Sequence, residues 1–299
     1  MNSVVALTSV TAQSRQWYLV SFLIEKLGVR GTAAATAITF GGVLLCIIIP
    51  YLLGSLNFGV MISRRQYKDD IRTHGSGNAG ATNMLRTFGT KAGILTMAGD
   101  MLKAVVAVGL GYLIIGVNAS VPGEGGALYR MVDQFGAAIA GLFVMLGHMF
   151  PIFFKFKGGK GVSTSAMVIL MISPISFVIC MLIFVIIVVG TRFVSLGSVM
   201  GVIFYPIILN AFSRIYDPPR NSTACMISVV MAVLVVYMHR ENLKRLRDGN
   251  ESKISFKKSK PAAETAAEAA AEAPAEPKPN PGNDPTAKRE GNRKNKSKK

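Results

Sequence analysis

Long apolar runs separated by short polar segments fill the chain from about residue 38 to residue 238. A transmembrane helix needs about 20 apolar residues, and somewhat fewer in a bundle or a thinned bilayer. One run, Val162–Val189, is too long for a single untilted helix and is interrupted by Ser173-Pro174, so it could form one span or two. The other candidate spans are Ile38–Ile62, Ala92–Val117, Phe135–Phe154, Ser195–Phe212 and Ala224–Met238.

The positions of Lys and Arg distinguish these two arrangements, because such residues in loops collect on the cytoplasmic side of a membrane. With two spans in Val162–Val189, seventeen Lys and Arg residues lie inside and three lie outside. With one span the numbers are eleven and nine. We therefore expect an all-α integral membrane protein, a seven-transmembrane-helix bundle over residues 37–251, with its N-terminus outside and its C-terminus cytoplasmic.

The two ends of the chain differ from this bundle. In the N-terminal extension, residues 1–36, the apolar stretch Trp17–Ile24 is too short to cross a bilayer, and we favour an interfacial amphipathic helix over a cleaved signal. Residues 252–299 are rich in Ala, Glu and Pro and then in Lys, with little to bury. We expect them to form a disordered cytoplasmic tail that the chemistry does not need.

Composition agrees with a membrane protein. Hydrophobic residues make up 51% of the chain, charged residues only 16%, and the mean hydropathy is +0.41. These values exclude an ordinary soluble domain, a coiled-coil rod and overall disorder. Cys46, Cys180 and Cys225 lie in apolar runs without ligand spacing, so we expect no disulfide framework, no metal site and no cofactor.

The first polar cluster follows the first span. It contains Gly54–Gly59, Arg64-Arg65, the segment Gly75–Asn83, which we call the glycine cradle, and Arg86. Glycine lets backbone N–H groups approach an oxyanion, and Ser, Thr and Asn add short donors, so the segment suits phosphate. It matches G-x-G-x-x-G, but a loop between two spans has no room for the βαβ unit of a dinucleotide site. The alternative is a hydrated glycine-rich connector.

The second polar cluster contains Gly147-His148, Lys155, Lys157 and the segment Gly158–Gly161, which we call the glycine loop, and it ends at Ser163-Thr164. A Walker A motif is excluded, because Gly161 stands where Ser or Thr should follow the lysine. What remains is a basic glycine loop before a helix N-terminus, which favours an anion. The alternative is that these lysines only set the topology.

Two further groups of polar residues stand out. The third polar cluster is the basic helix end, residues 239–247, in which His239 and Asn242 share one helix face. This helix end could instead contact anionic lipid. Asp100 and Lys103 lie three residues apart inside a span. Buried charges are expensive there, so the pair indicates either function or a structural ion pair.

Together these segments resemble the PlsY family of membrane-embedded, acyl-phosphate-dependent glycerol-3-phosphate acyltransferases. The likeness covers about residues 40–251, and His74 departs from it where an aromatic residue is expected. The matching segments are Gly54–Gly59, Gly75–Asn83, Leu85–Thr87, Gly99-Asp100 with Lys103, Gly147–Thr164, Ser195–Ser198, and His239–Asn242 with Arg245-Leu246 and Gly249.

The resemblance implies transfer of a fatty acyl group from acyl phosphate to glycerol 3-phosphate, which gives lysophosphatidic acid and inorganic phosphate. This would be the first acylation step of phospholipid synthesis in a bacterial inner membrane. The implied partners are these two substrates, membrane lipid and the enzyme that produces acyl phosphate, but no nucleic acid. Repeated glycine-rich and cationic segments on one cytoplasmic face suit a reaction between phosphate compounds.

We assign the site residues by role. The attacking hydroxyl needs a base, for which His239, His148 and a substrate phosphate oxygen are the candidates, and no His-x-x-x-x-Asp motif is present. We expect Arg65, Lys160 and His239 to converge on the phosphate groups. The catalytic candidates are His239, Asn242, Lys160 and Ser55. The binding candidates are Arg65, Gly75, Ser76, Gly77, Asn78, Thr82, Asn83, Arg86, Lys103, His148, Lys157, Gly158, Gly159, Gly161, Ser163 and Thr164.

A transporter or channel for phosphate-like anions is the alternative from another functional class. An intramembrane Asp100 and Lys103 would suit a permeation path. A carrier should, however, show inverted repeats and polar sites near the middle of the membrane. Here the clusters gather on one side and no repeat is visible. The asymmetry favours the acyltransferase.

Overall fold

The computed structural model describes residues 19–28, 32–115, 134–216 and 222–254, and within these ranges all regular structure is helical. The prediction of an all-α protein is therefore confirmed. The α-helices are α1 (Leu19–Lys26), α2 (Thr32–Gly54), α3 (Phe58–Gln66), α4 (Ala81–Phe88), α5 (Thr90–Ile114), α6 (Phe135–Met149), α7 (Val162–Ile172), α8 (Pro174–Thr191), α9 (Val194–Tyr216), α10 (Ser222–Met238) and α11 (Arg240–Arg247). Two 3₁₀ turns, η2 (Ile71–Thr73) and η3 (Ile152–Phe154), complete them.

Five helices of the described part are long and apolar enough to cross a membrane, or six if the bent pair of α10 and α11 counts as one span. The run Val162–Val189 breaks at Ser173-Pro174 as its sequence suggested: α7 ends at Ile172 and Pro174 opens α8. At 1.5 Å per residue, the 11 residues of α7 reach only about 16 Å, half of a bilayer core. Seven spans and their orientation stay predictions.

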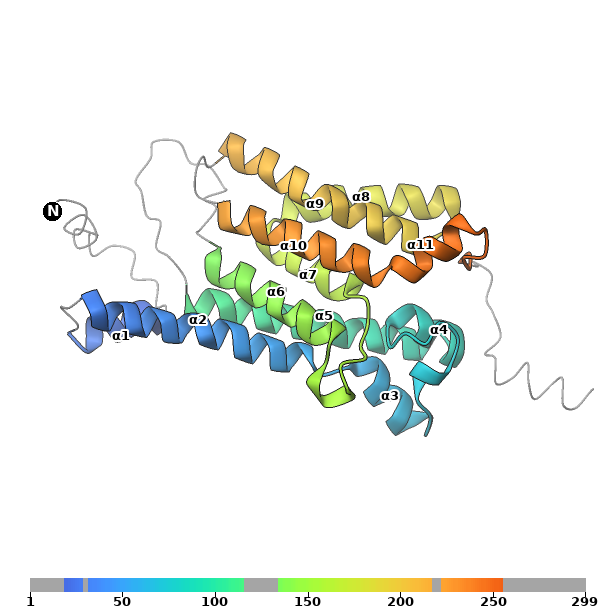
Figure 1. Cartoon of the computed structure of the whole chain (residues 1–299), viewed down its shortest axis with the longest axis horizontal. Coiled ribbons are helices and arrows are strands. Elements are labelled where there is room, and N and C mark those ends of the chain that lie inside the picture. Colours follow the sequence, from blue (N-terminus) through green and yellow to red (C-terminus); the bar gives the residue numbers. More distant parts are fainter. Residues whose placement is uncertain (1–18, 29–31, 116–133, 217–221, 255–299) are drawn as a thin grey trace, which may run out of the picture. The chain divides into compact units, whose positions relative to one another are not determined.

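Close helix contacts hold the bundle together (Figure 1). A Cβ atom on Gly54 would lie 2.2 Å from the carbonyl oxygen of Val144, and one on Gly147 would lie 2.2 Å from that of Tyr51. These two glycines therefore let α2 and α6 approach backbone to backbone, as small residues do in membrane proteins. Tyr51 also donates a hydrogen bond to the carbonyl of Phe150 at 2.9 Å.

The core lies between α5, α6, α7, α9 and α10. Tyr205, Leu209 and Met231 are among its fully buried side chains. The outer faces are equally apolar: Ile186 on α8 is 69% exposed and Met226 on α10 is 71% exposed. Large apolar side chains on both the inner and the outer face are what a lipid environment permits.

The two predicted end segments have different outcomes. Helix α1 forms where a short apolar helix was expected, and its Val20 packs with Cys46 and Ile114. Trp17 lies outside the described residues, as do residues 255–299 of the tail. The predicted tail begins at residue 252, and within its first residues Ile254 donates a backbone hydrogen bond to the carbonyl of Arg192 at 2.8 Å. We call residues 250–254 the C-terminal strap.

Candidate active site

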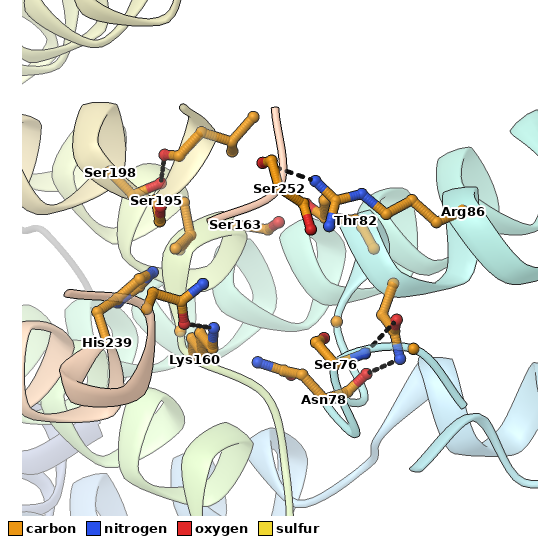
Figure 2. A pocket seen from close by; sticks show the side chains of 18 of the residues that line it. Ser76, Asn78, Thr82, Arg86, Lys160, Ser163, Ser195, Ser198, His239 and Ser252 are labelled. Carbon is orange, nitrogen blue, oxygen red and sulfur yellow. Dashed lines mark hydrogen bonds between the residues drawn. The ribbon is translucent and has the colours of Figure 1, made fainter. Parts of the chain in front are cut away.

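Helices α4 and α11 lie at the same end of the bundle (Figure 1). A cavity of about 590 Å³ lies there (Figure 2). All three polar clusters contribute to its wall. Segments that are far apart in the sequence therefore meet around one space, as the sequence predicted. The predicted site residues that line it are Gly75, Ser76, Asn78, Thr82, Asn83, Arg86, His148, Lys160, Gly161, Ser163, His239 and Asn242.

Asn83 organises the glycine cradle from inside. Its side-chain nitrogen donates to the carbonyls of Ile71, His74 and Asn78 at 3.2, 2.9 and 3.0 Å, and its side-chain oxygen accepts from the backbone N–H of Ser76 at 3.2 Å. The residue is 4% exposed. Asn83 therefore shapes the loop with both ends of its amide, while Ser76 and Asn78 face the cavity (Figure 2).

Two helix N-termini lie at the cavity wall. Gly80 precedes α4 and Gly161 precedes α7, so no side chain caps the first N–H groups of either helix. Gly161 has φ of +81°, a backbone conformation that side chains rarely adopt. Free N–H groups and the positive dipole end of each helix favour an anion beside them.

Lys160 carries the positive charge of the glycine loop into the cavity. Its ammonium donates a hydrogen bond to the side-chain oxygen of Asn242, so the second and third clusters are in direct contact (Figure 2). Burial, with a contribution from the positive charge of Arg245, lowers the pKa of Lys160 to about 8. The group is therefore still protonated for the most part at neutral pH and can pair with a phosphate.

His239 lies where α10 ends and α11 turns away by 55°. Its Nδ1 is 2.8 Å from the carbonyl oxygen of Val235, and because a carbonyl can only accept, Nδ1 carries the proton. The other ring nitrogen, Nε2, then holds a free lone pair. Since His239 lines the cavity, this nitrogen can accept a proton from a bound hydroxyl.

Glu251 in the C-terminal strap is a site residue that the sequence analysis did not select. Its carboxylate accepts hydrogen bonds from Ser195 Oγ, Asn242 Nδ2 and Arg245 Nε at 2.7, 2.6 and 2.9 Å. Burial raises the pKa of this carboxyl group, but the three hydrogen bonds and the charge of Arg245 outweigh burial and bring the pKa below its ordinary value. Glu251 thus stays ionised and fixes Asn242.

Arg72, a cation that was not among the predicted site residues, joins the first two clusters. Its guanidinium pairs with Asp70 at 2.8 Å and donates to the carbonyl of Phe154 at 2.9 Å. Hydrogen bonds from Arg72, helped by Arg64, lower the pKa of Asp70 well below its usual range. Arg72 therefore connects the segment before the glycine cradle to the segment before the glycine loop.

Several predicted residues do not line the cavity. Arg65 lies exposed on α3 and does not line the cavity, whereas Lys160 and His239 do. Lys157 is also exposed. Ser55 is buried, where its hydroxyl donates to the carbonyl of Tyr51 at 2.9 Å and accepts from the N–H of Ile152 at 3.4 Å. The others outside the wall are Gly77, Lys103, Gly158, Gly159 and Thr164.

The expected intramembrane pair is present. Lys103 Nζ lies 3.0 Å from Asp100 Oδ1, and His148 Nδ1 completes the group at 3.3 Å from the same oxygen. In the described part of the chain, no group of three or more His, Cys, Asp or Glu residues could hold a metal ion.

Comparisons with known proteins agree with this geometry. A sequence model of the family described as "Glycerol-3-phosphate acyltransferase" matches residues 44–249. The glycerol-3-phosphate acyltransferase of Thermoanaerobacter pseudethanolicus is 41% identical over 214 residues, 71% of this chain and 96% of the relative. The enzyme of the same name from Bacillus subtilis is 37% identical over 212 residues, 71% of this chain and 97% of the relative.

Two solved structures are also similar. The glycerol 3-phosphate form of PlsY, an integral membrane glycerol 3-phosphate acyltransferase, has a TM-score of 0.59 and 33% identity and covers 71% of this chain and 96% of its own. The lysophosphatidic acid form has a TM-score of 0.58 and 32% identity and covers 71% and 95%. Because these relatives are enzymes, the comparisons favour the acyltransferase over the alternative of an anion transporter or channel. The chain belongs to the PlsY family of integral membrane glycerol-3-phosphate acyltransferases.

Proposed function

We propose that the protein transfers a fatty acyl group from acyl phosphate to a hydroxyl of glycerol 3-phosphate, giving 1-acyl-glycerol 3-phosphate and inorganic phosphate. The observation that carries this proposal is that the three polar clusters line one cavity. Each substrate brings a phosphate group, so the reaction needs two anion-binding regions close together. The glycine cradle with Arg86 provides one, and the glycine loop with Lys160 provides the other.

The chemistry needs no protein nucleophile, because acyl phosphate is already an activated mixed anhydride. The hydroxyl oxygen attacks the acyl carbonyl carbon, a new C–O bond forms, and the C–O bond to phosphate breaks. The hydroxyl proton goes to His239 Nε2 or to a phosphate oxygen. Lys160 and the N-terminus of α7 stabilise the charge on the departing phosphate.

The acyl chain of the donor needs an apolar surface to pack against. One part of the cavity wall consists of Met97, Val162, Phe184 and Val194. Met97 on α5 is 39% exposed, and Leu102 and Val106 further along the same helix are also exposed apolar side chains. We place the acyl carbonyl near this wall, with the chain directed toward lipid.

The membrane arrangement is part of the proposal: seven spans, a bacterial inner membrane and a cytoplasmic active site, with the enzyme that makes acyl phosphate as a partner. The distribution of Lys and Arg supports this orientation. Single cysteines at Ser76, Lys157 and Asn242, in a background without native cysteines, should resist an impermeant thiol reagent in intact cells and react in inverted vesicles. Labelling of the Ser76 position in sealed cells would contradict this orientation.

The direct test of function uses purified protein in lipid nanodiscs. Acyl phosphate and glycerol 3-phosphate together should give equal amounts of inorganic phosphate and lysophosphatidic acid, and omitting glycerol 3-phosphate should abolish the lipid product. A parallel reaction with acyl-CoA tests the donor. Acyl transfer from acyl-CoA alone would contradict the proposal.

A further inference from the structure

Three charged or titratable side chains lie together at the cavity, and two of them, Asp100 and His148, line its wall. Asp100 and Lys103 come from α5 and His148 comes from the end of α6, and they are 1%, 4% and 3% exposed. Lys103 Nζ is 3.0 Å from Asp100 Oδ1 and 3.0 Å from His148 Nδ1. Such a cluster is costly to bury, so its contacts should show what it does.

The contacts of Lys103 leave it no proton for a substrate. Its ammonium has three protons. Two are donated to the carbonyls of Gly54 and Leu56, at 2.9 and 2.7 Å, where α2 gives way to α3. The third is needed by Asp100 or His148. Lys103 therefore binds protein groups only, and it ties the junction of α2 and α3 to α5 and α6.

The glycine loop rests on His148. The backbone N–H of Gly159 donates to the carbonyl of His148 at 3.1 Å. A Cβ atom on Gly159 would lie 2.1 Å from His148 Nε2, and one on Gly158 would lie 2.0 Å from the His148 carbonyl oxygen. The loop thus has no room to move toward the ring. The position of the ring sets the position of the loop and of the next residue, Lys160.

We propose that Asp100, Lys103 and His148 form a positioning unit that holds the glycine loop so that Lys160 meets Asn242 in the cavity. The unit acts through His148, and none of its members needs to react. The effects on kcat/KM that we expect from this unit rest on the proposed function. A purely structural ion pair would affect stability but would leave the position of Lys160 unchanged.

The contact between Gly159 and His148 gives a test that does not depend on removing charges. Gly159→Ala should reduce kcat/KM by about 100-fold, as a misplacement near 1 Å can. In a His148→Ala background, which lacks the ring, the same change should cost less than about threefold, because the two changes are coupled. Equal losses in both backgrounds would overturn the proposal. Gly109→Ala is the control, since a Cβ there meets nothing within 4 Å.

The pH profile separates positioning from stability. In the intact protein, kcat/KM should fall on the alkaline side near pH 8, where Lys160 loses its proton. The groups that face Lys160 are Arg245 and Arg86, which lower its pKa, Glu251, which raises it, and the imidazole of His239. In Asp100→Asn/Lys103→Met, Lys160 should lose burial, and the alkaline limb should move up toward the ordinary value of 10.5. If Asp100→Asn/Lys103→Met folds but the alkaline limb of its kcat/KM profile stays near pH 8, the positioning role is overturned.

A labelling experiment needs no activity and so separates this inference from the proposed function. In a background without native cysteines, Lys160→Cys should react with a thiol reagent at least about fivefold faster once Asp100→Asn/Lys103→Met is added, because displacement opens its partly buried site. Lys155→Cys, on an exposed residue, should not change. An unchanged rate at position 160 overturns the inference, whereas an inactive wild-type protein with the faster rate overturns only the function.

Discussion

The two glycine-rich segments at the cavity are held in different ways. The glycine cradle is closed from within by Asn83, which bonds four backbone groups of residues 71–78. The glycine loop has no such internal anchor and instead rests on His148 from another helix. A local loop can thus be specified by one side chain inside it or by a buried group beneath it. A change at Asn83 should therefore disrupt only the glycine cradle. The glycine loop, by contrast, should be displaced by changes in the helices that hold His148.

The largest effect should come from the internal anchor. Asn83→Ala would leave three carbonyls and one N–H of residues 71–78 without this partner, and a buried unsatisfied group costs about 1–3 kcal/mol. We expect stability to fall by about 3 kcal/mol or more and kcat/KM to fall more than about 100-fold. Thermal unfolding in detergent and kinetics in nanodiscs measure the two losses. Near-normal activity would mean that the cradle keeps its shape without Asn83.

Lys160→Ala should come next and should act on chemistry alone. Removing one charge-assisted contact to phosphate costs about 1.5–3 kcal/mol, roughly 10–150-fold in kcat/KM, while insertion and unfolding temperature stay normal. Lys155→Ala is the matched control on the same segment, since Lys155 is exposed and outside the cavity wall. Equal losses in the two variants would argue that the segment only sets topology.

A smaller effect should separate the two arginines near the cradle. Arg72→Ala removes the bonds to Asp70 and Phe154 that join the two glycine-rich segments, and we expect about a tenfold loss of kcat/KM. The exposed Arg65, by contrast, should tolerate alanine with less than about a twofold change. Initial-rate kinetics at limiting glycerol 3-phosphate make the comparison. The opposite ranking would support the phosphate-binding role that we predicted for Arg65.

The smallest effect should come from the tail. Truncation after Ser259 removes only chain beyond the C-terminal strap, so turnover in nanodiscs should remain within about twofold. Truncation after Asn250 is the informative partner, because it removes Glu251 with its three hydrogen bonds. Specific activity of both proteins is compared at matched insertion. A large loss in the longer protein would show that the tail supports catalysis.

The sequence predicted the helices well because lipid imposes a simple rule. Each apolar run must form a helix that satisfies its own backbone, so runs such as Ala92–Val117 correspond closely to helices such as α5. The break at Ser173-Pro174 followed from local chemistry, since proline opens a helix readily. The sequence did not predict how short α7 is, because a run of apolar residues does not show how far its helix extends across the membrane.

The sequence predicted which segments form the site, but not which of their side chains face the cavity. Motif density and charge located the three clusters, but the direction of each side chain depends on turns that no pattern encodes. Arg65 and Arg72 both precede the cradle, and only the turn at Asp70 brings Arg72 to the other segment. Glu251 gave no signal, because it is one acid in a basic region. Ser55 was a catalytic candidate, and its hydroxyl contacts the backbone of Tyr51 and Ile152.

The two uncapped helix N-termini have a consequence for regulation. Binding sites of this kind recognise a phosphate group by its oxygens and charge, whatever is attached to it. Under the proposed reaction, each turnover releases inorganic phosphate into the same cavity, where it competes with the next acyl phosphate. The rate would then depend on the ratio of acyl phosphate to inorganic phosphate at the cavity.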